Sequence, residues 1–492
     1  MTNQPRSVRV QYLVVGSGAG GAITAVELAR AGFEVVVLEE GARHGLDAYG
    51  KGVTHAMQTL YRNRGMTPIL GSVPIGFVEG RCLGGSTEIN SGFWHRMPPE
   101  FVLRWVSQFG INDFSVEQLA PHYQWCEEQL KVVETGDRLQ KNSEVFKRGV
   151  ESMGWSARAI PRAAGDCVNT NQCASGCPQG AKQGMTRNLV PLAEAAGCKF
   201  ITNCKVKLLL KAKNRVTGVL AEIKREDNST DLVRIDADHV FLCAGATQTP
   251  ALLRRSGIKS HVGDTFQIHP MLKVSALFDE EIDAHKSVMP VLQVKEFWPD
   301  IQLGGSFFST GQLAMNLSDN WTESQHLMRD YRKMATYNVA VRSTGYGSVR
   351  PARFGSEYAI LRFELSDVDI RNLSQGLARL ASLLLRAGAK SVHPCIQSLP
   401  AITSELDAVK WLDENLSRSS LSLTAVHAFS TCPMGERRDR CAVDSYGKVF
   451  GFENLFVNDA SMLPESPGIN PQGTIMAIAR RNVLNFIANK RG

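Results

Sequence analysis

The chain has 492 residues, of which 43% are hydrophobic and 21% are charged, and its net charge is +7. This composition is typical of a folded globular protein with two or more lobes, and it excludes a disordered or fibrous chain. The small positive charge is spread over the whole chain and forms no basic stripe, so we do not expect a nucleic-acid partner.

The N-terminal stretch MTNQPRSVR has neither an apolar core nor a small-residue cleavage site, so it does not resemble a signal peptide. No window of about 18 apolar residues follows it. The run LARLASLLLRAGAKSV from Leu377 carries arginines at amphipathic spacing and predicts a surface helix. We therefore expect a cytoplasmic protein without a transmembrane segment. The alternative is export together with a partner subunit that carries a signal.

The first predicted unit is a strand, a turn, a helix and a second strand, which together span about 30 residues. The strand VRVQYLVV (8–15) leads into GSGAGGAITAVELARAG, and FEVVVLEEG follows. Gly16 permits the tight turn, Gly18 lets the backbone approach a pyrophosphate, and Gly21 lets the helix pack closely on the strand. Glu39, at the end of the second strand, can accept the ribose hydroxyls. The unit predicts a site for a dinucleotide, either FAD or NAD.

Two later units have the same strand, turn and helix order. HVFLCAGATQTPALL begins at His239, and the strand at 454–458 ends at Asp459 before a helix from about Thr474. Between them, VMPVLQV, FWPDIQLGGSFF and YAILRFEL are strand-like pieces without a readable motif. The predicted fold class is therefore α/β. It combines a Rossmann-like nucleotide-binding domain, assembled from separated segments, with an antiparallel-sheet substrate-binding domain.

Four sequence blocks follow one another in a specific order. The turn GSGAGG with Glu39 is followed by GRCLGGSTEIN (80–90), GATQTPALLRRSG (245–257) and HAFSTCPMG (427–435), and INPQGT comes last. These blocks resemble the glucose-methanol-choline (GMC) oxidoreductases, a family of FAD-dependent alcohol oxidases and dehydrogenases. Two small residues depart from the family pattern: Ser430 replaces a frequent glycine, and Thr87 replaces a frequent serine.

The resemblance assigns catalytic roles to His427 and Asn470, the latter in place of the second histidine of some members. Oxidising an alcohol removes a hydride, which flavin accepts at N5, and a proton, which a histidine titrating near neutral pH can take. Asn470 would hold the substrate oxygen, and Pro471 would fix the turn that presents it. His269 is expected to pack at the edge of the substrate lobe and not to act in catalysis.

The resemblance also implies contacts to the flavin. Gly84 and Gly85 would let the chain approach the ring, Ser86 and Asn90 would hydrogen-bond to it, and the main chain of Val206 would meet the adenine. The full predicted set of cofactor-binding residues is Gly16, Gly18, Gly21, Glu39, Gly84, Gly85, Ser86, Asn90, Val206, Ala244, Asp459 and Pro471.

The positions of these blocks predict a division of the chain into domains. Residues 1–95, 161–270 and 406–492 would form the FAD-binding domain, with the active site in the last part. Residues 96–160 would form a substrate or cap segment, and residues 271–405 the substrate-binding domain.

Cys167, Cys173 and Cys177 are gathered in DCVNTNQCASGCPQGAK, with five and then three residues between them. In a reducing compartment such thiols are metal ligands or reactive groups more often than a disulfide. Zinc and four-iron clusters prefer a fourth ligand. The spacing resembles the segment that holds a three-iron cluster in bacterial sugar dehydrogenases of the same family. The alternatives are a structural role or a disulfide.

The predicted enzyme is an FAD-dependent dehydrogenase that oxidises a small-molecule alcohol to the aldehyde or ketone and passes the electrons to an external acceptor. An iron–sulfur cluster would give electrons a route to an acceptor protein or a quinone and favour a dehydrogenase. The first alternative is an alcohol oxidase that uses oxygen and releases hydrogen peroxide. The second is a flavin-binding redox sensor without turnover.

Overall fold

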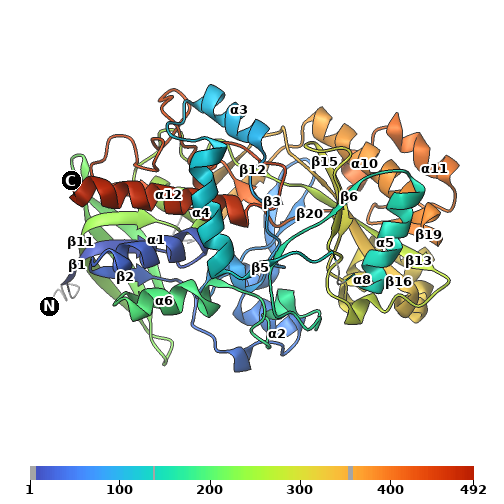
Figure 1. Cartoon of the computed structure of the whole chain (residues 1–492), viewed down its shortest axis with the longest axis horizontal. Helices are drawn as coiled ribbons and strands as arrows, with labels where there is room; N and C mark the ends of the chain where they lie inside the picture. The colour runs from blue at the N-terminus through green and yellow to red at the C-terminus, as the bar shows by residue number, and fades with distance from the viewer. Residues whose placement is uncertain (1–6, 137–138, 353–357, 492) are drawn as a thin grey trace.

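A largely parallel sheet brings the N-terminal, middle and C-terminal parts of the chain side by side (Figure 1). The computed structural model describes residues 7–136, 139–352 and 358–491, so most of the N-terminal stretch examined for a signal lies outside the described residues. The sheet has the order β8-β2-β1-β11-β10-β9, and β22 pairs with β11. Its strands are β1 (Ser7–Val15), β2 (Val35–Leu38), β8 (Lys199–Ile201), β9 (Cys204–Ala212), β10 (Arg215–Lys224), β11 (Thr230–Leu242) and β22 (Leu455–Val457).

The first strand, helix and strand form the unit that the glycine pattern predicts. Helix α1 (Ala19–Arg30) starts directly after Gly18, and Gly32, with φ of 87°, ends the turn behind it. β1 pairs in parallel with β2 on one side and with β11 on the other. Helices α6 (Leu189–Ala195) and α12 (Gln472–Arg491) pack against α1, so the N- and C-terminal segments form one layer on the sheet (Figure 1).

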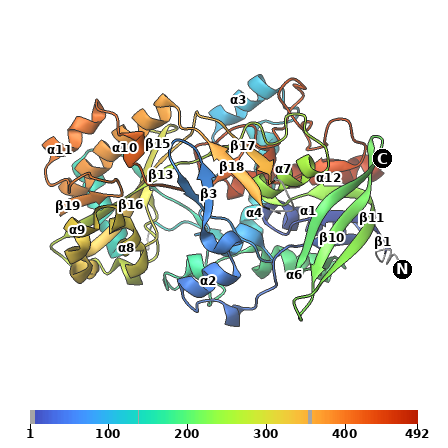
Figure 2. The same cartoon turned by 180° about the vertical axis from the view of Figure 1, so that it is seen from behind.

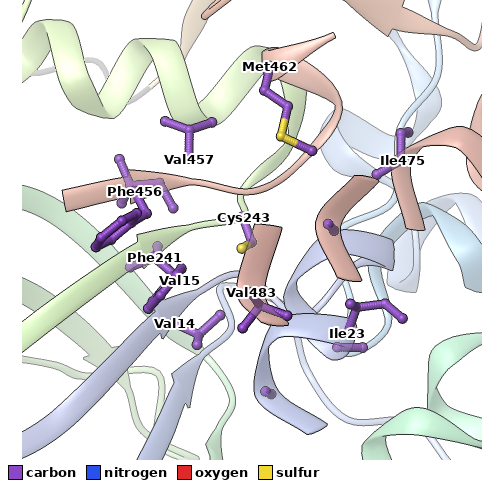
Figure 3. Packing of buried hydrophobic residues seen from close by; sticks show 14 of the residues in the cluster. Val14, Val15, Ile23, Phe241, Cys243, Phe456, Val457, Met462, Ile475 and Val483 are labelled. Atoms are coloured by element: carbon purple, nitrogen blue, oxygen red, sulfur yellow. The ribbon is translucent and has the colours of Figure 1, made fainter. Parts of the chain in front are cut away.

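The core of this layer joins residues that are far apart in the sequence (Figure 3). Val14 on β1 and Ile23 on α1 are fully buried, and so is Val483 on α12. The rings of Phe241 on β11 and Phe456 on β22 stack with their centroids 4.8 Å apart. Hydrophobic burial therefore fastens the C-terminal segment to the first βαβ unit.

A second sheet lies on the other side of the molecule (Figure 2). Its order is β17-β18-β3-β4-β20-β13-β16-β15-β14-β6, and β19 pairs with β13. The strands are β3 (Thr67–Leu70), β4 (Ile75–Phe77), β6 (Ala157–Ala159), β13 (Met271–Phe278), β14 (Leu292–Val294), β15 (Ile301–Gly305), β16 (Met334–Val341), β17 (Gly347–Pro351), β18 (Ala359–Phe363), β19 (Ala389–Pro394) and β20 (Leu423–Ala425). Helix α10 (Asp367–Arg386) packs on β13, β15 and β16 and contains much of the predicted amphipathic run.

The predicted α/β fold class is confirmed, with one difference in how the second sheet is built. β3, β4, β6 and β20 come from outside residues 271–405, and the β18–β3 and β20–β4 pairs are parallel. Strand pairing across such distances depends on tertiary contacts that the local sequence pattern does not encode. The division into an FAD-binding and a substrate-binding domain stays a prediction.

The other elements connect and cover the two sheets. The helices are α2 (Val53–Thr59), α3 (Pro99–Phe109), α4 (Val116–Gln129), α5 (Lys141–Ser152), α7 (Gly245–Arg255), α8 (Thr310–Leu317), α9 (Trp321–Ser324) and α11 (Glu405–Val409). The short strands β5 (Val132–Val133) and β7 (Arg162–Ala163) pair with each other, as do β12 (Gln267–Ile268) and β21 (Ala428–Phe429). Among the described residues, no helix has the length and apolar character needed to cross a bilayer. The cellular location stays a prediction.

Candidate active site

One cavity of about 1320 Å³ extends from the carboxyl ends of β1, β2 and β11 to the face of the second sheet. This volume exceeds the roughly 300–1,000 Å³ of a site for one drug-sized ligand. His427 and Asn470 lie in its wall, together with all the predicted cofactor-binding residues except Gly21 and Gly84. The cavity can therefore hold a large cofactor and a second, smaller molecule.

The amino end of α1 opens into this cavity. A Cβ atom at Gly18 would have no heavy atom within 4 Å, and no side chain caps the first turn of the helix. In contrast, a Cβ atom at Gly16 would overlap the carbonyl oxygen of Cys243, and one at Gly21 would overlap that of Gly16. Gly16 and Gly21 thus permit close packing of strand and helix, while Gly18 leaves room for a phosphate at a helix amino terminus.

Glu39 lies at the end of β2 and connects two of the predicted blocks. Its carboxylate accepts hydrogen bonds from the backbone nitrogen of Ser17 (3.0 Å), the Ser17 hydroxyl (2.6 Å) and the backbone nitrogen of Gly41 (2.8 Å). The same hydroxyl accepts a hydrogen bond from Gly84 (3.0 Å). Burial raises the pKa of Glu39, and these donors oppose the shift. Gly84 therefore shapes the cavity through Ser17 without lining it.

Asp459 follows β22 and ties three loops together in the cavity wall. Its Oδ2 accepts hydrogen bonds from the backbone nitrogen of Gly245 (2.8 Å) and the hydroxyl of Thr249 (2.6 Å), and its Oδ1 accepts one from Ser461 (2.8 Å). Ala244, the residue before α7, donates to the same Thr249 hydroxyl (3.1 Å). Asp459 thus organises the protein side of the predicted cofactor site.

The remaining predicted cofactor residues line the cavity from several directions. The hydroxyl of Ser86 accepts a hydrogen bond from Gly80 (2.9 Å), and Gly85 has φ of 58°. Asn90 donates to the side chain of Gln472 (2.5 Å), which links the glycine-rich loop to α12. Val206 on β9 and Pro471 before α12 complete this set.

His427 and Asn470 meet in the cavity wall. Asn470 Nδ2 lies 3.4 Å from His427 Nε2, and Asn470 Oδ1 accepts a hydrogen bond from Gln293 Nε2 at 3.3 Å. Because Gln293 holds the amide oxygen, the amide nitrogen of Asn470 faces the imidazole. Burial, together with the positive charge of Lys273, lowers the pKa of His427 to about 4. The imidazole is therefore neutral at neutral pH.

His269 also contacts His427. The sequence predicted only a packing role for His269. Their Nδ1 atoms are 3.0 Å apart. Burial lowers the pKa of His269 well below its ordinary value, so it is neutral as well. Among the described residues, its Nε2 has no hydrogen-bond partner. The sequence identified His269 only as a packing residue and did not identify Gln293. Their proximity to His427 and Asn470 depends on segments that are far apart in the chain.

A largely buried ion-pair network lines the part of the cavity next to β2. The sequence did not predict this network. Arg62 lies 3.0 Å from Glu40 and 2.8 Å from Glu79, and Lys205 lies 3.2 Å from Glu40. Burial alone would raise the pKa of Glu40, but the two cations outweigh it and hold that pKa at about 2. Glu40 follows Glu39 directly in the chain, whereas Arg62, Glu79 and Lys205 come from distant segments.

The three clustered cysteines lie outside this cavity. They are half-buried free thiols around a void of about 10 Å³, which is at most the space of one water molecule. The guanidinium of Arg162 lies between two of them, 4.0 Å from Cys167 Sγ and 3.3 Å from Cys173 Sγ. In the described parts of the chain, no group of three or more His, Cys, Asp or Glu side chains is arranged to hold a metal ion. The predicted iron–sulfur site at Cys167, Cys173 and Cys177 is therefore not supported, because sequence spacing does not determine where the sulfur atoms point.

Comparison with protein families matches most of the chain to GMC oxidoreductases. The family model for the N-terminal part matches residues 11–271, and the model for the C-terminal part matches residues 346–479. An uncharacterised GMC-type oxidoreductase of Sinorhizobium fredii is 38% identical over 97% of this chain and 95% of that protein. A long-chain-alcohol oxidase of Arabidopsis thaliana is 25% identical over 96% of this chain and 67% of that protein.

Solved structures share the fold at low sequence identity. Pyridoxine 4-oxidase from Mesorbium loti has a TM-score of 0.71 and 15% identity, with 97% of this chain and 99% of that chain covered. Formate oxidase of Aspergillus oryzae has a TM-score of 0.70 and 15% identity, with 99% of both chains covered.

Proposed function

Because the chain belongs to the GMC oxidoreductase family, we propose that it is an FAD-dependent enzyme that oxidises an alcohol to an aldehyde or ketone. The observation that carries the proposal is one cavity that joins the open amino end of α1 to the His427–Asn470 pair. A visible flavin spectrum of the purified protein, bleached by an alcohol without oxygen, is the direct test.

The residues of the cavity fit FAD. The backbone at Gly18 leaves space for the pyrophosphate at the amino end of α1, and Glu39 lines the cavity where a ribose can be held. FAD bound in this cavity supplies the acceptor for the hydride that leaves the carbinol carbon. Retention of NAD in place of FAD after purification would contradict this part of the proposal.

The hydrogen-bond directions favour His427 Nε2 as the proton acceptor. Asn470 Nδ2 carries hydrogens and faces Nε2, so Nε2 is the acceptor of this pair. The neutral imidazole then carries its hydrogen on Nδ1, from which it can donate to Nδ1 of His269. We assign His269 as a positioning residue that holds His427 in this tautomer, while Asn470 holds the substrate oxygen.

Replacing Asn470 with alanine should lower kcat by about 10²-fold, the cost of one hydrogen-bond donor to the developing charge on oxygen. The rate of flavin reduction by a saturating alcohol without oxygen measures this effect. Asn489→Ala, on the exposed end of α12, is the matched control and should reduce flavin at the wild-type rate. An Asn470→Ala enzyme with an unchanged rate would remove Asn470 from the mechanism.

The rate should persist to unusually low pH. A histidine base acts only in its neutral form, so kcat/KM falls as the pH drops through the pKa of His427. That pKa is about 4, compared with 6.5 for an ordinary histidine, so the acid limb of the profile should lie near pH 4. Lys273→Met removes a charge that lowers this pKa and should move the limb to higher pH. A wild-type limb near 6.5 would contradict the assignment.

The electron acceptor separates two candidate enzymes. An iron–sulfur cluster would have favoured the expected dehydrogenase, but the cysteine geometry does not support such a cluster. An oxidase is the second candidate, because the similar proteins from Arabidopsis thaliana and Mesorbium loti are named oxidases. Oxygen uptake with formation of hydrogen peroxide would identify an oxidase. Reduction of a quinone or dye without peroxide would identify a dehydrogenase.

A further inference from the structure

A row of residues crosses the second sheet on the face that lines the cavity. The strand register places Lys273 on β13 opposite Asn338 on β16, Asn338 opposite Gly304 on β15, and Gly304 opposite Gln293 on β14. All four residues line the cavity. Residues directly opposite in neighbouring strands lie on the same face of a sheet. Gly304 has no side chain, and the Gln293 side chain lies against it, with its Cγ 3.2 Å from where a Cβ atom of residue 304 would be. The row therefore presents one cation, Lys273, and the amides of Asn338 and Gln293 to the cavity.

Lys273 is the cation of this row, and no counter-ion for it lies within residues 7–136, 139–352 and 358–491. Its Nζ donates a hydrogen bond to the hydroxyl of Ser306 (2.9 Å), and among the described residues no carboxylate forms an ion pair with it. The thiol of Cys395 nearby is neutral, because burial raises its pKa to about 12. Burial lowers the pKa of Lys273 to about 8, so the ammonium still carries its charge at neutral pH. A half-buried charge without a partner is costly, and an anion would offset that cost.

The other cations of the cavity wall lie elsewhere. Arg62 and Lys205 are paired with Glu40 in the network beside β2. Arg255 on α7 donates to the carbonyl oxygen of Lys207 on β9, in the nucleotide-binding sheet. Lys273 is distinct because it lies on the substrate side, close enough to His427 to influence its charge.

We propose that the substrate is an alcohol that also carries a carboxylate, and that Lys273 binds this carboxylate while the hydroxyl lies at His427 and Asn470. This inference rests on the proposed function, since it takes the histidine end of the cavity as the place of oxidation. It names the chemical class of the substrate, a hydroxy acid.

The spacing along the chain indicates how far apart the two groups of the substrate are. Lys273 follows His269 by four residues in extended chain, which separates their Cα atoms by at most about 13 Å. Met271 lies between them and lines the cavity, as do Leu423 and Met289. This separation and these apolar side chains leave room for an apolar body of several carbon atoms between the hydroxyl and the carboxylate.

Matched pairs of alcohols test the proposal. The holoenzyme is assayed for flavin reduction with p-(hydroxymethyl)benzoate and p-methylbenzyl alcohol, and with ω-hydroxycaproate and hexanol. Each pair differs in the carboxylate. We expect kcat/KM to be higher for the carboxylate member by about tenfold to a hundredfold, the range for a hydrogen bond to a charged group. Equal values within both pairs, or a preference for the neutral alcohols, would overturn the inference.

Two variants connect the preference to Lys273. In Lys273→Met, kcat/KM should be about equal for the two members of each pair. Lys273→Arg should keep most of the wild-type preference for the carboxylate member. Lys390→Met is the matched control, because Lys390 lies on β19 of the same sheet but pairs with Asp279 (2.7 Å) and does not line the cavity. The control should keep the wild-type ratio. A wild-type ratio in Lys273→Met would show that another group selects the carboxylate.

A binding measurement separates this inference from the proposed function. p-Toluate carries the carboxylate and no hydroxyl, so it cannot be oxidised as an alcohol. We expect p-toluate to raise the melting temperature of the wild-type holoenzyme and to have less effect on Lys273→Met. If no alcohol reduces the flavin but p-toluate binds through Lys273, the proposed function fails and the anion site stands. If neutral alcohols reduce the flavin and p-toluate does not bind, the proposed function stands and the anion site at Lys273 fails.

Discussion

Replacing His427 with glutamine should lower kcat by about 10²- to 10⁴-fold, the usual contribution of a positioned acid or base. Glutamine keeps a polar side chain in the wall but cannot take up a proton at neutral pH. The loss corresponds to about 3–5 kcal/mol of activation free energy. The measurement is the rate of flavin reduction by a saturating alcohol without oxygen, so that reoxidation of the flavin does not limit it.

Two controls accompany this measurement: the FAD content of His427→Gln and the activity of a variant at an exposed histidine, His326. His427→Gln should keep its FAD, because Gly18 and Glu39 line a different part of the cavity. His326→Gln changes an exposed histidine outside the cavity lining and should reduce flavin at the wild-type rate. A His427→Gln enzyme that retains FAD and reduces it at the wild-type rate would place the proton acceptor on another residue.

Replacing Gly18 with aspartate should abolish retention of FAD during purification. A carboxylate at the amino end of α1 would face the pyrophosphate, and juxtaposed like charges cost several kcal/mol. The dissociation constant for FAD should therefore rise by about 10²-fold or more. The chain should still fold, because φ at Gly18 is −67° and a Cβ atom there meets no heavy atom within 4 Å. Flavin absorbance per protein measures the loss.

A neutral variant of the same size separates charge from volume. Gly18→Asn should bind FAD more tightly than Gly18→Asp, because it occupies the same space without the negative charge. Circular dichroism of both variants should match that of the wild-type protein after its flavin is removed. Wild-type FAD content in Gly18→Asp would show that the pyrophosphate binds elsewhere.

The elements near Gly16 and His427 illustrate what local sequence can predict. The glycine spacing after the first strand predicts a turn and a helix because Gly16 and Gly21 leave no room for a side chain, and α1 begins directly after Gly18. The C-terminal strand and helix were placed within a few residues for a similar reason, since Asn470 and Pro471 end a loop before α12. The prediction without support is the iron–sulfur site, because the sulfur atoms of Cys167 and Cys173 lie on either side of the Arg162 guanidinium.

By itself, the sequence determined the α/β class and the dinucleotide turn at Gly16–Gly21, because both depend on short segments whose local geometry is restricted. The nomination of His427 and Asn470 came from the resemblance of their sequence blocks to the GMC family. Only the tertiary structure decided that His269 lies 3.0 Å from His427, that Gln293 orients Asn470, and that Lys273 in the cavity wall has no carboxylate partner among the described residues. These contacts depend on the register of strands that are distant in the chain. Register is set by the packing of whole sheet faces, so the local pattern of residues does not reveal it.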